Sequence, residues 1–496
     1  MMFVDMENMQ RSALIEPLCS RSLAKIRLAA ISVYVPPIVV SQEEVSFFCK
    51  VPLEKITKGL GQHQMAVTVD SEDSVSLALN SLQLLIDDEA VQDILSKVTI
   101  GRFEVGTESA VDKAKSIKSF LVDVIGATRT TGADITNACL GGVLALENAI
   151  SWLSTVDCDE TKKYPAAIVV TTDISIYNDP ASLPTGGAGA VAMLLIKGYH
   201  SGIECDLSFN SYWENSTDFY KPHIASPVPM VHGATSIECY LRANLLAAVS
   251  NKQQRRLFLD ADFTCFHTPY CTLPKKIHAV LCHVLSLEPH DEAKLLASLR
   301  SESDNVLSIL SKSCLANSSI LDDCERRCIP SLGLSGQTGN IYTGSIFLAL
   351  VSVLEHVEAI TNQAVAASST YTHVLPKEKY LIYASGYGSG MGSTAFKLCV
   401  YPKQMPRILR SKRIAAPPSK GMLQLSLESN KRLLMYKLSH DPLVCSFLRD
   451  RYHQQVILGS DEYVTVDRAH FSCGEWYLDR IGCDGTRHYK RYPDKS

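Results

Sequence analysis

The sequence predicts an α/β layered fold in which two similar halves follow one another. Segments with strand-like and helix-like patterns alternate along the chain, which is typical of layered α/β proteins. Two of the strand segments, Ala166 to Thr172 and Ala188 to Ile196, are continuously apolar, as expected where helices cover both faces of a sheet. In both halves a chemically reactive residue directly follows a strand.

The elements of the N-terminal half can be taken in chain order. β-branched residues predict a strand over Ile26 to Val35. Apolar residues at helical spacing predict a helix over Ser74 to Ile86. A strand follows over Val98 to Glu104, and a short strand over Ala133 to Asn137 leads into an apolar helix that begins near Cys139.

The C-terminal half repeats this rhythm, which indicates an internal duplication. A strand over Phe263 to Phe266 ends just before His267, and a helix is predicted over Gly344 to Val357. A further strand, Tyr380 to Ser385, runs into the glycine-rich stretch Gly386 to Gly392.

Two segments near the C-terminus carry many basic residues. The stretch Gln404 to Lys420 is rich in Pro, Lys and Arg and is interpreted as a loop or linker. The basic end of the segment Trp476 to Tyr492 is interpreted as a solvated edge strand, with a phosphate-binding role as the alternative.

Composition excludes several classes of protein. The chain has 496 residues, and 48 Lys and Arg nearly balance 52 Asp and Glu, for a net charge of −4. That balance excludes a strongly basic nucleic-acid binder and an acidic disordered tail. No window has the run of about 18 apolar residues that a membrane span requires, so neither nucleic acid nor membrane is an expected partner.

The 16 cysteines are expected to be reduced and mostly buried. Disulfide frameworks are typical of small secreted chains, and the first 25 residues lack the apolar core of a signal peptide. Cys324 and Cys328 have metal-like spacing but no matching second pair, so no metal site is expected.

Three residues at predicted strand ends are candidates for catalysis. Cys139 lies at a strand-to-helix turn beside Gly141 and Gly142, where backbone N–H groups and the helix dipole are expected to favour the thiolate. Glu108 follows a strand where open sheets build their sites, and His267 lies between a strand and a Pro turn. Taken singly, each has a structural alternative: a core cysteine, a glutamate at a helix start, and a core histidine.

Two glycine-rich turns do not match nucleotide-binding motifs. Thr185 to Ala190 lacks the lysine and hydroxyl of a P-loop, and Gly388 to Gly392 lacks the spacing of a dinucleotide fingerprint. Both are interpreted as tight turns that bring backbone close to an active centre.

Taken together, these signals resemble the 3-hydroxy-3-methylglutaryl-CoA synthase family of the thiolase superfamily. The resemblance covers about residue 24 to the end and is weakest in 1–23, 285–330 and 400–460. It rests on nine ordered motifs: Gly59-Leu-Gly-Gln62, Glu104-Val-Gly-Thr-Glu-Ser109 with Asp112-Lys113, Asn137-Ala-Cys139, Pro184-Thr-Gly-Gly187, Asp218-Phe-Tyr-Lys-Pro222, Phe266-His-Thr-Pro-Tyr-Cys271, Gly339-Asn-Ile-Tyr-Thr343, Tyr387-Gly-Ser-Gly390 and Trp476-Tyr477.

The resemblance implies a duplicated αβαβα thiolase-like fold with a C-terminal family-specific extension. The expected organisation is an N-terminal extension over 1–23, an N-terminal half over 24–200 that carries the nucleophile, and a C-terminal half with its extension over 201–496. By analogy with thiolase-fold enzymes, a homodimer is expected.

The resemblance also implies the chemistry. Cys139 takes the acetyl group from acetyl-CoA, Glu108 removes a proton from the acetyl methyl, and His267 anchors acetoacetyl-CoA. This acyltransferase reaction supplies the mevalonate pathway to isoprenoids and sterols. No metal or redox cofactor is needed, because the thioester itself stabilises charge on its α-carbon.

Further residues match positions that bind substrate or support the centre. Backbone N–H groups of Cys139 and near Ser389 are expected to hold the oxyanions. The positions expected to bind substrate or CoA are Lys55, Tyr177, Thr185, Ser236, Lys276, Asn340, Tyr387 and Ser389. The supporting positions are Asn137, Asp173 and Asp218.

Five positions depart from the family pattern: Leu140, Ala181, Leu183, Tyr212 and Thr272. The family has tyrosine, asparagine, arginine, histidine and a CoA-contacting lysine there. Loss of a positive charge from the pocket should weaken the binding of CoA and make that binding depend less on salt concentration. Two alternatives to an active synthase therefore stay open: a condensing enzyme with another substrate, and a weakly active or inactive copy.

The compartment expected from the sequence is the cytoplasm. Acidic residues among the first 25 argue against a mitochondrial transit peptide, although three basic residues keep a mitochondrial form open as the alternative.

Overall fold

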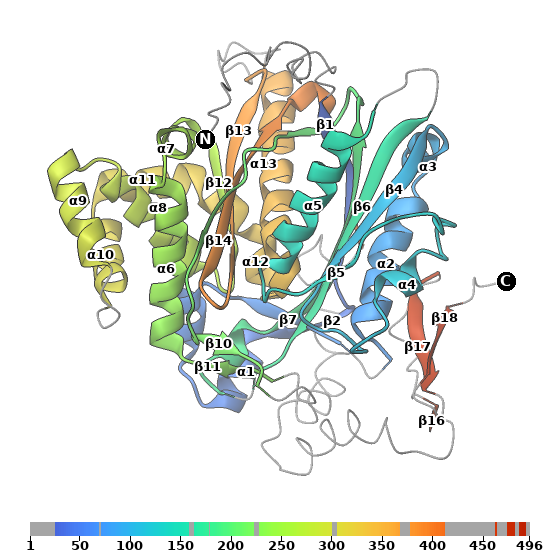
Figure 1. The fold of residues 1–496 in the computed structure, drawn as a ribbon. Helices are drawn as coiled ribbons and strands as arrows, with labels where there is room; N and C mark the ends of the chain where they lie inside the picture. The colour runs from blue at the N-terminus through green and yellow to red at the C-terminus, as the bar shows by residue number, and fades with distance from the viewer. Residues whose placement is uncertain are drawn as a thin grey trace, which may run out of the picture.

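The computed structural model describes residues 25–68, 71–157, 163–177, 179–222, 228–299, 305–367, 377–411, 462–463, 474–481 and 486–492. The extension expected over 1–23 lies outside these residues, and the division of the chain at residue 200 stays a prediction. Two portions of a mixed sheet enclose a central layer of helices, and further helices cover the outer faces (Figure 1). The predicted αβαβα architecture is confirmed.

One hydrogen-bonded ladder runs through both halves in the order β12-β13-β14-β8-β1-β7-β6-β4-β5, with β9 added to β14 and β15 to β1. β8 (Ile203–Cys205) joins the halves because it pairs with both β1 and β14. The remaining strands are β1 (Ile26–Tyr34), β4 (Val98–Gly106), β5 (Asp134–Ile135), β6 (Tyr164–Ser175), β7 (Gly187–Lys197), β9 (Asn210–Trp213), β12 (Phe263–Phe266), β13 (Tyr380–Gly388), β14 (Gly392–Val400) and β15 (Arg407–Arg410).

The continuous apolar strands are buried on both faces, as their sequences predict. In β6, Ala167 and Val169 face the central helices, whereas Ile168 and Val170 face the outer layer. β7 alternates in the same way. Because side chains point to opposite faces of a strand in turn, two apolar faces require an uninterrupted apolar run.

The central layer consists of α5 (Gly141–Thr155) and α13 (Ser345–Ala367), which pack between the two portions of the sheet (Figure 1). α13 extends beyond the predicted end at Val357. The segment Tyr342–Asn362, which includes most of α13 and the turn before it, is long and apolar enough to cross a membrane, but 72% of its most apolar window is buried inside the protein. That burial is typical of a core helix.

Outer helices cover both portions of the sheet. On the N-terminal side α2 occupies the predicted range, because Asp73 caps its first turn by accepting from two backbone N–H groups. The helices of this face are α2 (Ser74–Ile86), α3 (Glu89–Ser96) and α4 (Lys118–Leu121). Those on the C-terminal side are α6 (Gly233–Val249), α7 (Lys252–Asp260), α8 (Thr272–Val284), α9 (Pro289–Ser298), α10 (Val306–Leu315) and α11 (Ser318–Arg327).

Short elements complete the lower part of the molecule in Figure 1. β2 pairs with β3, and β10 pairs with β11. These elements are β2 (Ile38–Ser41), α1 (Gln42–Cys49), η2 (Lys55–Leu60), β3 (Gln64–Val67), β10 (Phe219–Tyr220) and β11 (Met230–Val231). The remaining helical turns are η3 (Leu183–Thr185), η4 (Ile329–Ser331), α12 (Gly333–Thr338), η5 (Tyr342–Gly344) and η6 (Pro402–Gln404).

The prediction of a loop over Gln404 to Lys420 is wrong for its first part. Residues Arg407 to Arg410 form β15, which pairs in parallel with β1. Arg407 bonds to Asp88, an exposed arginine–carboxylate contact that the sequence pattern does not reveal. Residues 412–420 lie outside the described part of the chain.

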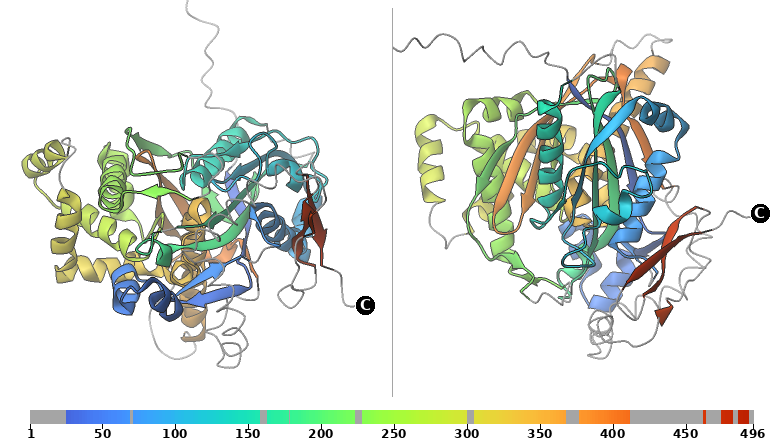
Figure 2. Two further views of the ribbon diagram at one scale, coloured as in Figure 1. Left: turned by 90° about the horizontal axis from the view of Figure 1, so that it is seen from below. Right: turned by 45° about the vertical axis from the view of Figure 1, so that its right-hand side comes forward.

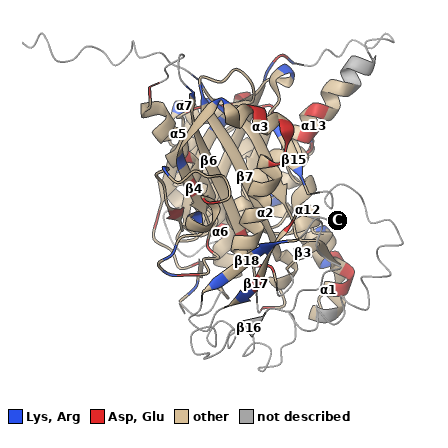
Figure 3. Ribbon diagram, turned by 90° about the vertical axis from the view of Figure 1, so that its right-hand side faces the viewer, with Lys and Arg blue, Asp and Glu red and all other residues tan. Residues whose placement is uncertain are grey.

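The C-terminal segment forms a small sheet that packs against α2 on one side of the molecule (Figure 2). Its strands are β16 (Glu462–Tyr463), β17 (Trp476–Ile481) and β18 (Arg487–Arg491). Basic residues gather on β17 and β18 (Figure 3). Three of them, Arg487, Lys490 and Arg491, pair with Asp73, Asp479 and Asp87. These ion pairs favour the edge-strand interpretation over phosphate binding.

Candidate active site

The predicted nucleophile lies at the point where β5 leads into α5. Ala138, the residue before Cys139, has φ of 44°, a conformation uncommon for a residue with a side chain. Backbone strain of this kind is found at functional sites, where the surrounding structure enforces it. α5 also packs very closely on its neighbours, since a Cβ on Gly142 would lie 2.3 Å from the carbonyl oxygen of Thr343. The sequence Cys-Leu-Gly-Gly therefore fixes the sulfur against the end of the sheet.

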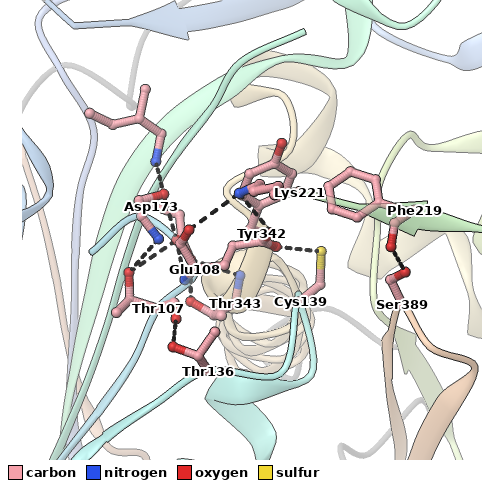
Figure 4. A network of polar contacts seen from close by, with 12 residues as sticks. Thr107, Glu108, Thr136, Cys139, Asp173, Phe219, Lys221, Tyr342, Thr343 and Ser389 are labelled. Carbon is pink, nitrogen blue, oxygen red and sulfur yellow. Dashed lines mark hydrogen bonds and ion pairs between the residues drawn. The ribbon is translucent and has the colours of Figure 1, made fainter. Parts of the chain in front are cut away.

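Glu108 faces this sulfur from the end of the neighbouring strand. The distance from Cys139 Sγ to Glu108 Oε1 is 3.4 Å (Figure 4). Glu108 lies just beyond β4 in a non-helical segment, so the alternative of a helix-start glutamate is wrong. Its side chain is only 4% exposed, and a carboxylate this close to a thiol can exchange a proton with it.

Asp173 of β6 holds the segment that carries Glu108. Its Oδ1 accepts hydrogen bonds from the Glu108 N–H at 2.9 Å and from the Ser109 hydroxyl at 2.8 Å. Its Oδ2 accepts from the Thr343 N–H at 3.0 Å and from the Thr343 hydroxyl. Asp173 thus ties the ends of β4 and β6 to η5. Burial and the nearby charge of Glu108 raise its pKa, whereas these hydrogen bonds oppose the rise.

The surroundings of Cys139 do not favour the thiolate that the helix start suggests in the sequence. Burial of the sulfur raises the pKa of the Cys139 thiol well above its usual value, and the negative charges of Glu108 and Asp173 raise it further. Lys221 opposes this rise. The residue keeps some solvent exposure, but burial and the two carboxylates together keep the pKa high, so the sulfur carries its proton at rest.

Lys221, which follows β10, completes the network. Its Nζ lies 2.9 Å from Glu108 Oε2 and donates to the Glu108 carbonyl oxygen at 3.2 Å. The sequence motif Asp-Phe-Tyr-Lys-Pro contains this lysine, but sequence reasoning assigned it no role. Tyr342 and Thr343 were likewise quoted only within a motif. Lys221, Tyr342 and Thr343 each lie in a motif in which a neighbouring residue was assigned a role. That position in a motif is the sequence signal that points to them.

A second group of predicted residues surrounds Asp218. Tyr387 and Ser389, from β13 and the turn that follows it, donate to the two carboxylate oxygens at 2.8 and 3.0 Å. The Gly390 N–H also bonds to Asp218, at 3.3 Å. This turn lies against the Cys139 segment, since a Cβ on Gly388 would lie 2.5 Å from the carbonyl oxygen of Asn137.

A third group lies around Asn340, which begins the connection to α13. Its Nδ2 donates to the Tyr177 hydroxyl at 3.4 Å, and its Oδ1 accepts from the Tyr342 N–H at 2.8 Å. The Tyr342 ring lies edge-on to the rings of Tyr177 and Phe219. Tyr342 therefore connects this group with Lys221 and the segment of Asp218 (Figure 4).

His267 lies just beyond β12 and is 1% exposed. Its N–H bonds to the Ser385 carbonyl oxygen, and its carbonyl accepts from Tyr240. Nδ1 of the ring is buried without a hydrogen-bond partner among the described residues, unlike that of a satisfied core histidine. Burial lowers its pKa to about 3, so the imidazole is neutral at physiological pH.

Among the described residues, the remaining predicted positions make no hydrogen bond to the side chains of Cys139 or Glu108. Lys55 on η2 is exposed, and Lys276 on α8 is partly buried, with its pKa lowered by burial and by Lys312. Ser236 lies in the first turn of α6, and the carbonyl of Thr185 accepts from the Asn340 N–H. Nδ2 of Asn137 is buried, with no hydrogen-bond partner in the described structure.

The departures from the family pattern have structural roles of their own. Leu140 is fully buried in the central core, and Leu183 packs in the apolar cluster around α1. Ala181 is exposed. Tyr212 donates to Glu214 at 2.8 Å, and Thr272 donates to the Gly59 carbonyl oxygen at 2.7 Å, which ties α8 to η2.

A cavity of about 490 Å³ lies on α6, and Met391 of the β13–β14 turn contributes to its wall. Its charged lining residues are Glu214, Glu238 and Arg242, and Arg242 pairs with Glu214 at 2.9 Å. None of the predicted site residues lines it.

Nine of the eleven cysteines in the described part of the chain are buried, and all eleven are free thiols. One group of potential metal ligands, His278, Cys282 and Asp323, lies on α8 and α11. Asp323 also pairs with Arg327 at 2.9 Å, so a positively charged side chain already balances this carboxylate. Cys324 and Cys328 do not belong to this group.

Two family models match the chain. The model described as "Hydroxymethylglutaryl-coenzyme A synthase N terminal" matches residues 23–198, and its C-terminal counterpart matches residues 203–417. Together they cover well over half of the sequence.

Similar proteins cover nearly the whole chain. Hydroxymethylglutaryl-CoA synthases A and B of Dictyostelium discoideum are 35% and 31% identical over 94% of this chain, and cover 90% and 97% of their own lengths. The mitochondrial synthase of Rattus norvegicus is 32% identical over 94% of this chain and 89% of its own. A solved structure of MvaS with 3-hydroxy-3-methylglutaryl coenzyme A has a TM-score of 0.67 and 25% identity, over 95% of this chain and 99% of that one.

Proposed function

The chain belongs to the hydroxymethylglutaryl-CoA synthase family, and we propose that Cys139, Glu108 and His267 carry its reaction. The enzyme is an acyltransferase of the mevalonate pathway. It condenses acetyl-CoA with acetoacetyl-CoA and water, and it releases 3-hydroxy-3-methylglutaryl-CoA and CoA. The observation that carries the assignment is the 3.4 Å contact between Cys139 Sγ and Glu108 Oε1.

The first step is transfer of the acetyl group to Cys139. Because the thiol keeps its proton at rest, attack on the thioester carbonyl requires a base, and Glu108 is in contact with the sulfur. As the tetrahedral intermediate collapses, the carbon–sulfur bond to CoA breaks. The proton held by Glu108 passes to the departing CoA sulfur, and acetyl-Cys139 remains.

The second step forms the new carbon–carbon bond. Glu108, again a carboxylate, removes a proton from the methyl of acetyl-Cys139, and the resulting carbon attacks the 3-keto carbon of acetoacetyl-CoA. The keto oxygen becomes the 3-hydroxyl by taking up the proton that Glu108 removed, which returns Glu108 to its carboxylate form. The neutral His267 ring offers a hydrogen bond near the reacting oxygen, and its open Nδ1 supports this role. Water then hydrolyses the thioester to Cys139 and releases the product.

The remaining predicted positions bind the acyl chain or CoA in this proposal. Asn340 and Tyr177 hold the acyl portion, and Lys55 and Lys276 attract the phosphates of CoA. The Cys139 N–H is proposed for the oxyanion, because the Gly390 N–H is engaged by Asp218. Thr272 stands where the family has a CoA-contacting lysine and supplies no positive charge, so a raised KM for the CoA thioesters is expected.

The test is acetyl transfer followed by intact-mass measurement. Protein is incubated with acetyl-CoA and then with acetoacetyl-CoA, and the adduct is located by peptide mass. One acetyl group on Cys139 that disappears on addition of the second substrate, with release of the six-carbon product, is expected. An adduct on another cysteine would contradict the assignment of the nucleophile.

We also propose that the enzyme is a homodimer that pairs along β5. β5 is the last strand of the sheet on the N-terminal side, and an open sheet edge is a ready surface for pairing. Light scattering on the full chain tests this proposal: twice the chain mass is expected, and a monomer at micromolar concentration would contradict it.

The cytoplasm is the proposed compartment, supported by the acidic residues Asp5, Glu7 and Glu16 near the N-terminus. Fractionation of cells that express the chain with a C-terminal tag tests this proposal. Recovery with mitochondria would overturn it.

A further inference from the structure

Within the described part of the chain, Lys221 Nζ makes two polar contacts, and both are to Glu108. Its Nζ lies 2.9 Å from Oε2 of the carboxylate and 3.2 Å from the backbone carbonyl oxygen (Figure 4). The Lys221 side chain is 20% exposed, so little water competes for these contacts. A cation that holds both the main chain and the side chain of one residue restricts how that side chain can turn.

Aromatic rings fix the ammonium from the opposite side. Nζ lies 4.9 Å from the centre of the Tyr342 ring and 6.0 Å from that of Phe219. A cation over an aromatic face is attracted by the ring, more strongly where water is scarce. Lys221 is therefore held in place between a carboxylate and two rings.

Lys221 also balances negative charge at the site. The titratable groups that face it are Glu108 after β4, Cys139 before α5 and Asp173 of β6. Burial disfavours its charged form and is the largest single influence, but attraction and hydrogen bonding to Glu108, together with attraction to Asp173 and Cys139, hold the pKa of Lys221 above its ordinary value. Without this cation, Glu108 and Asp173 would face each other with no positive charge in contact with Glu108.

We propose that Lys221 is a positioning residue, whose ion pair with Oε2 holds the Glu108 carboxylate in place and leaves Oε1 turned toward the acyl group on Cys139. This inference rests on the proposed role of Glu108 as the base. The two oxygens thereby have separate tasks, since Oε2 holds the cation and Oε1 exchanges the proton. When Oε1 takes a proton the ion pair weakens, and it is restored when the proton passes to the departing CoA sulfur.

The test compares Lys221→Met and Lys221→Gln, which remove the charge, with Lys221→Arg, which keeps it. The rate of product formation is measured against pH. In both neutral variants kcat is expected to fall by at least about tenfold. The acidic limb of the profile is expected to move up by about one pH unit, because the ionised carboxylate loses its counter-charge. KM should change far less than kcat, and Lys221→Arg should leave the limb in place.

Lys197→Met is the matched control. Lys197 is also a buried lysine, but it donates to the carbonyl oxygens of Ser154 and Val156 at the far end of α5. Its loss is expected to lower the melting temperature without moving the acidic limb. A folded neutral Lys221 variant with an unmoved limb would overturn the proposal. So would failure of both neutral variants to fold while the control folds, because Lys221 would then serve stability.

Glu108→Gln distinguishes a wrong assignment of Glu108 as the base from a wrong assignment of Lys221 as the positioning residue. If this variant condenses the substrates at the full rate, the assignment of the base is wrong, whatever Lys221 does. If it is inactive and the limb of Lys221→Met stays in place, only the positioning role fails.

Discussion

Replacement of Asp173 by Asn should slow condensation and at the same time make the Cys139 thiol more reactive. Oδ2 of Asp173 accepts from both the N–H and the hydroxyl of Thr343. If the amide NH₂ of the substituted side chain takes the place of Oδ2, it faces the Thr343 N–H, and neither of these two donors can accept a hydrogen bond. The Thr343 hydroxyl can rotate and accept from the amide instead. Hydrogen bonds to a charged group contribute about 1.5–3 kcal/mol each, so loss of the N–H contact alone removes up to about 3 kcal/mol.

That loss falls on the connection between β6 and η5, next to the segment that carries Glu108. If all of it appeared in the transition state, kcat/KM would fall about a hundredfold. The thiol should respond in the opposite direction, because the charge of Asp173 is one cause of the raised pKa of Cys139. At a fixed pH, alkylation of Cys139 by iodoacetamide is therefore expected to become faster.

The assay pairs initial rates of CoA release with peptide-mass measurement of alkylation at Cys139. Asp323→Asn is the matched control, since Asp323 also accepts from several donors but lies on α11 in the other half of the molecule. It should lower stability and leave the alkylation rate of Cys139 unchanged. Folded Asp173→Asn protein with unchanged condensation, or with slower alkylation, would refute this account of the site.

Three further outcomes are expected. Gly142→Ala places a Cβ 2.3 Å from the Thr343 carbonyl oxygen, so a loss of about 1–3 kcal/mol in unfolding free energy is expected. Urea titration measures it, and unchanged stability would contradict the close packing of α5. Folded His267 stays neutral down to about pH 3, whereas unfolded histidine protonates near pH 6.5. Its contribution to stability is therefore complete above about pH 6.5 and lost as pH falls toward 3. Melting curves of His267→Gln should accordingly depend less on pH in that window, and an equal dependence would argue against a buried neutral ring. Cys139→Ala should fold normally and take up no acetyl group from acetyl-CoA, and an adduct in this variant would assign the nucleophile elsewhere.

Much of the fold could be predicted because its signals are local. The range of α2 follows from its apolar spacing, and Asp73 at the cap supplies its start. The apolar runs of β6 and β7 record burial on two faces. β15 was missed because its four residues sit in a Pro- and Lys/Arg-rich stretch, and only pairing with β1, far away in sequence, makes them a strand.

The sequence could predict which residues form the site, but not which of them contact one another. Cys139 and Glu108 stand out at strand ends, but their contact joins residues 31 positions apart. Lys221 is 113 positions from Glu108, and its motif does not reveal that the two residues meet. The same limit applies to the prediction about the thiolate. A helix start is visible in the sequence, whereas the burial of the sulfur and its approach to the two carboxylates arise only from the packing of β4 and β6.

The charges at the centre constrain the order of proton transfers. Glu108 and Asp173 already place two acidic groups beside one ammonium, so a thiolate at Cys139 would add a further anion in a poorly hydrated space, at a high cost in free energy. Retention of the thiol proton avoids that cost until substrate arrives. Attack on acetyl-CoA must then coincide with proton transfer to Glu108. Because Glu108 must be a carboxylate again for the methyl proton, it has to pass the first proton to the departing CoA sulfur. A single carboxylate can serve both steps only in that order, and departure of CoA is what resets it.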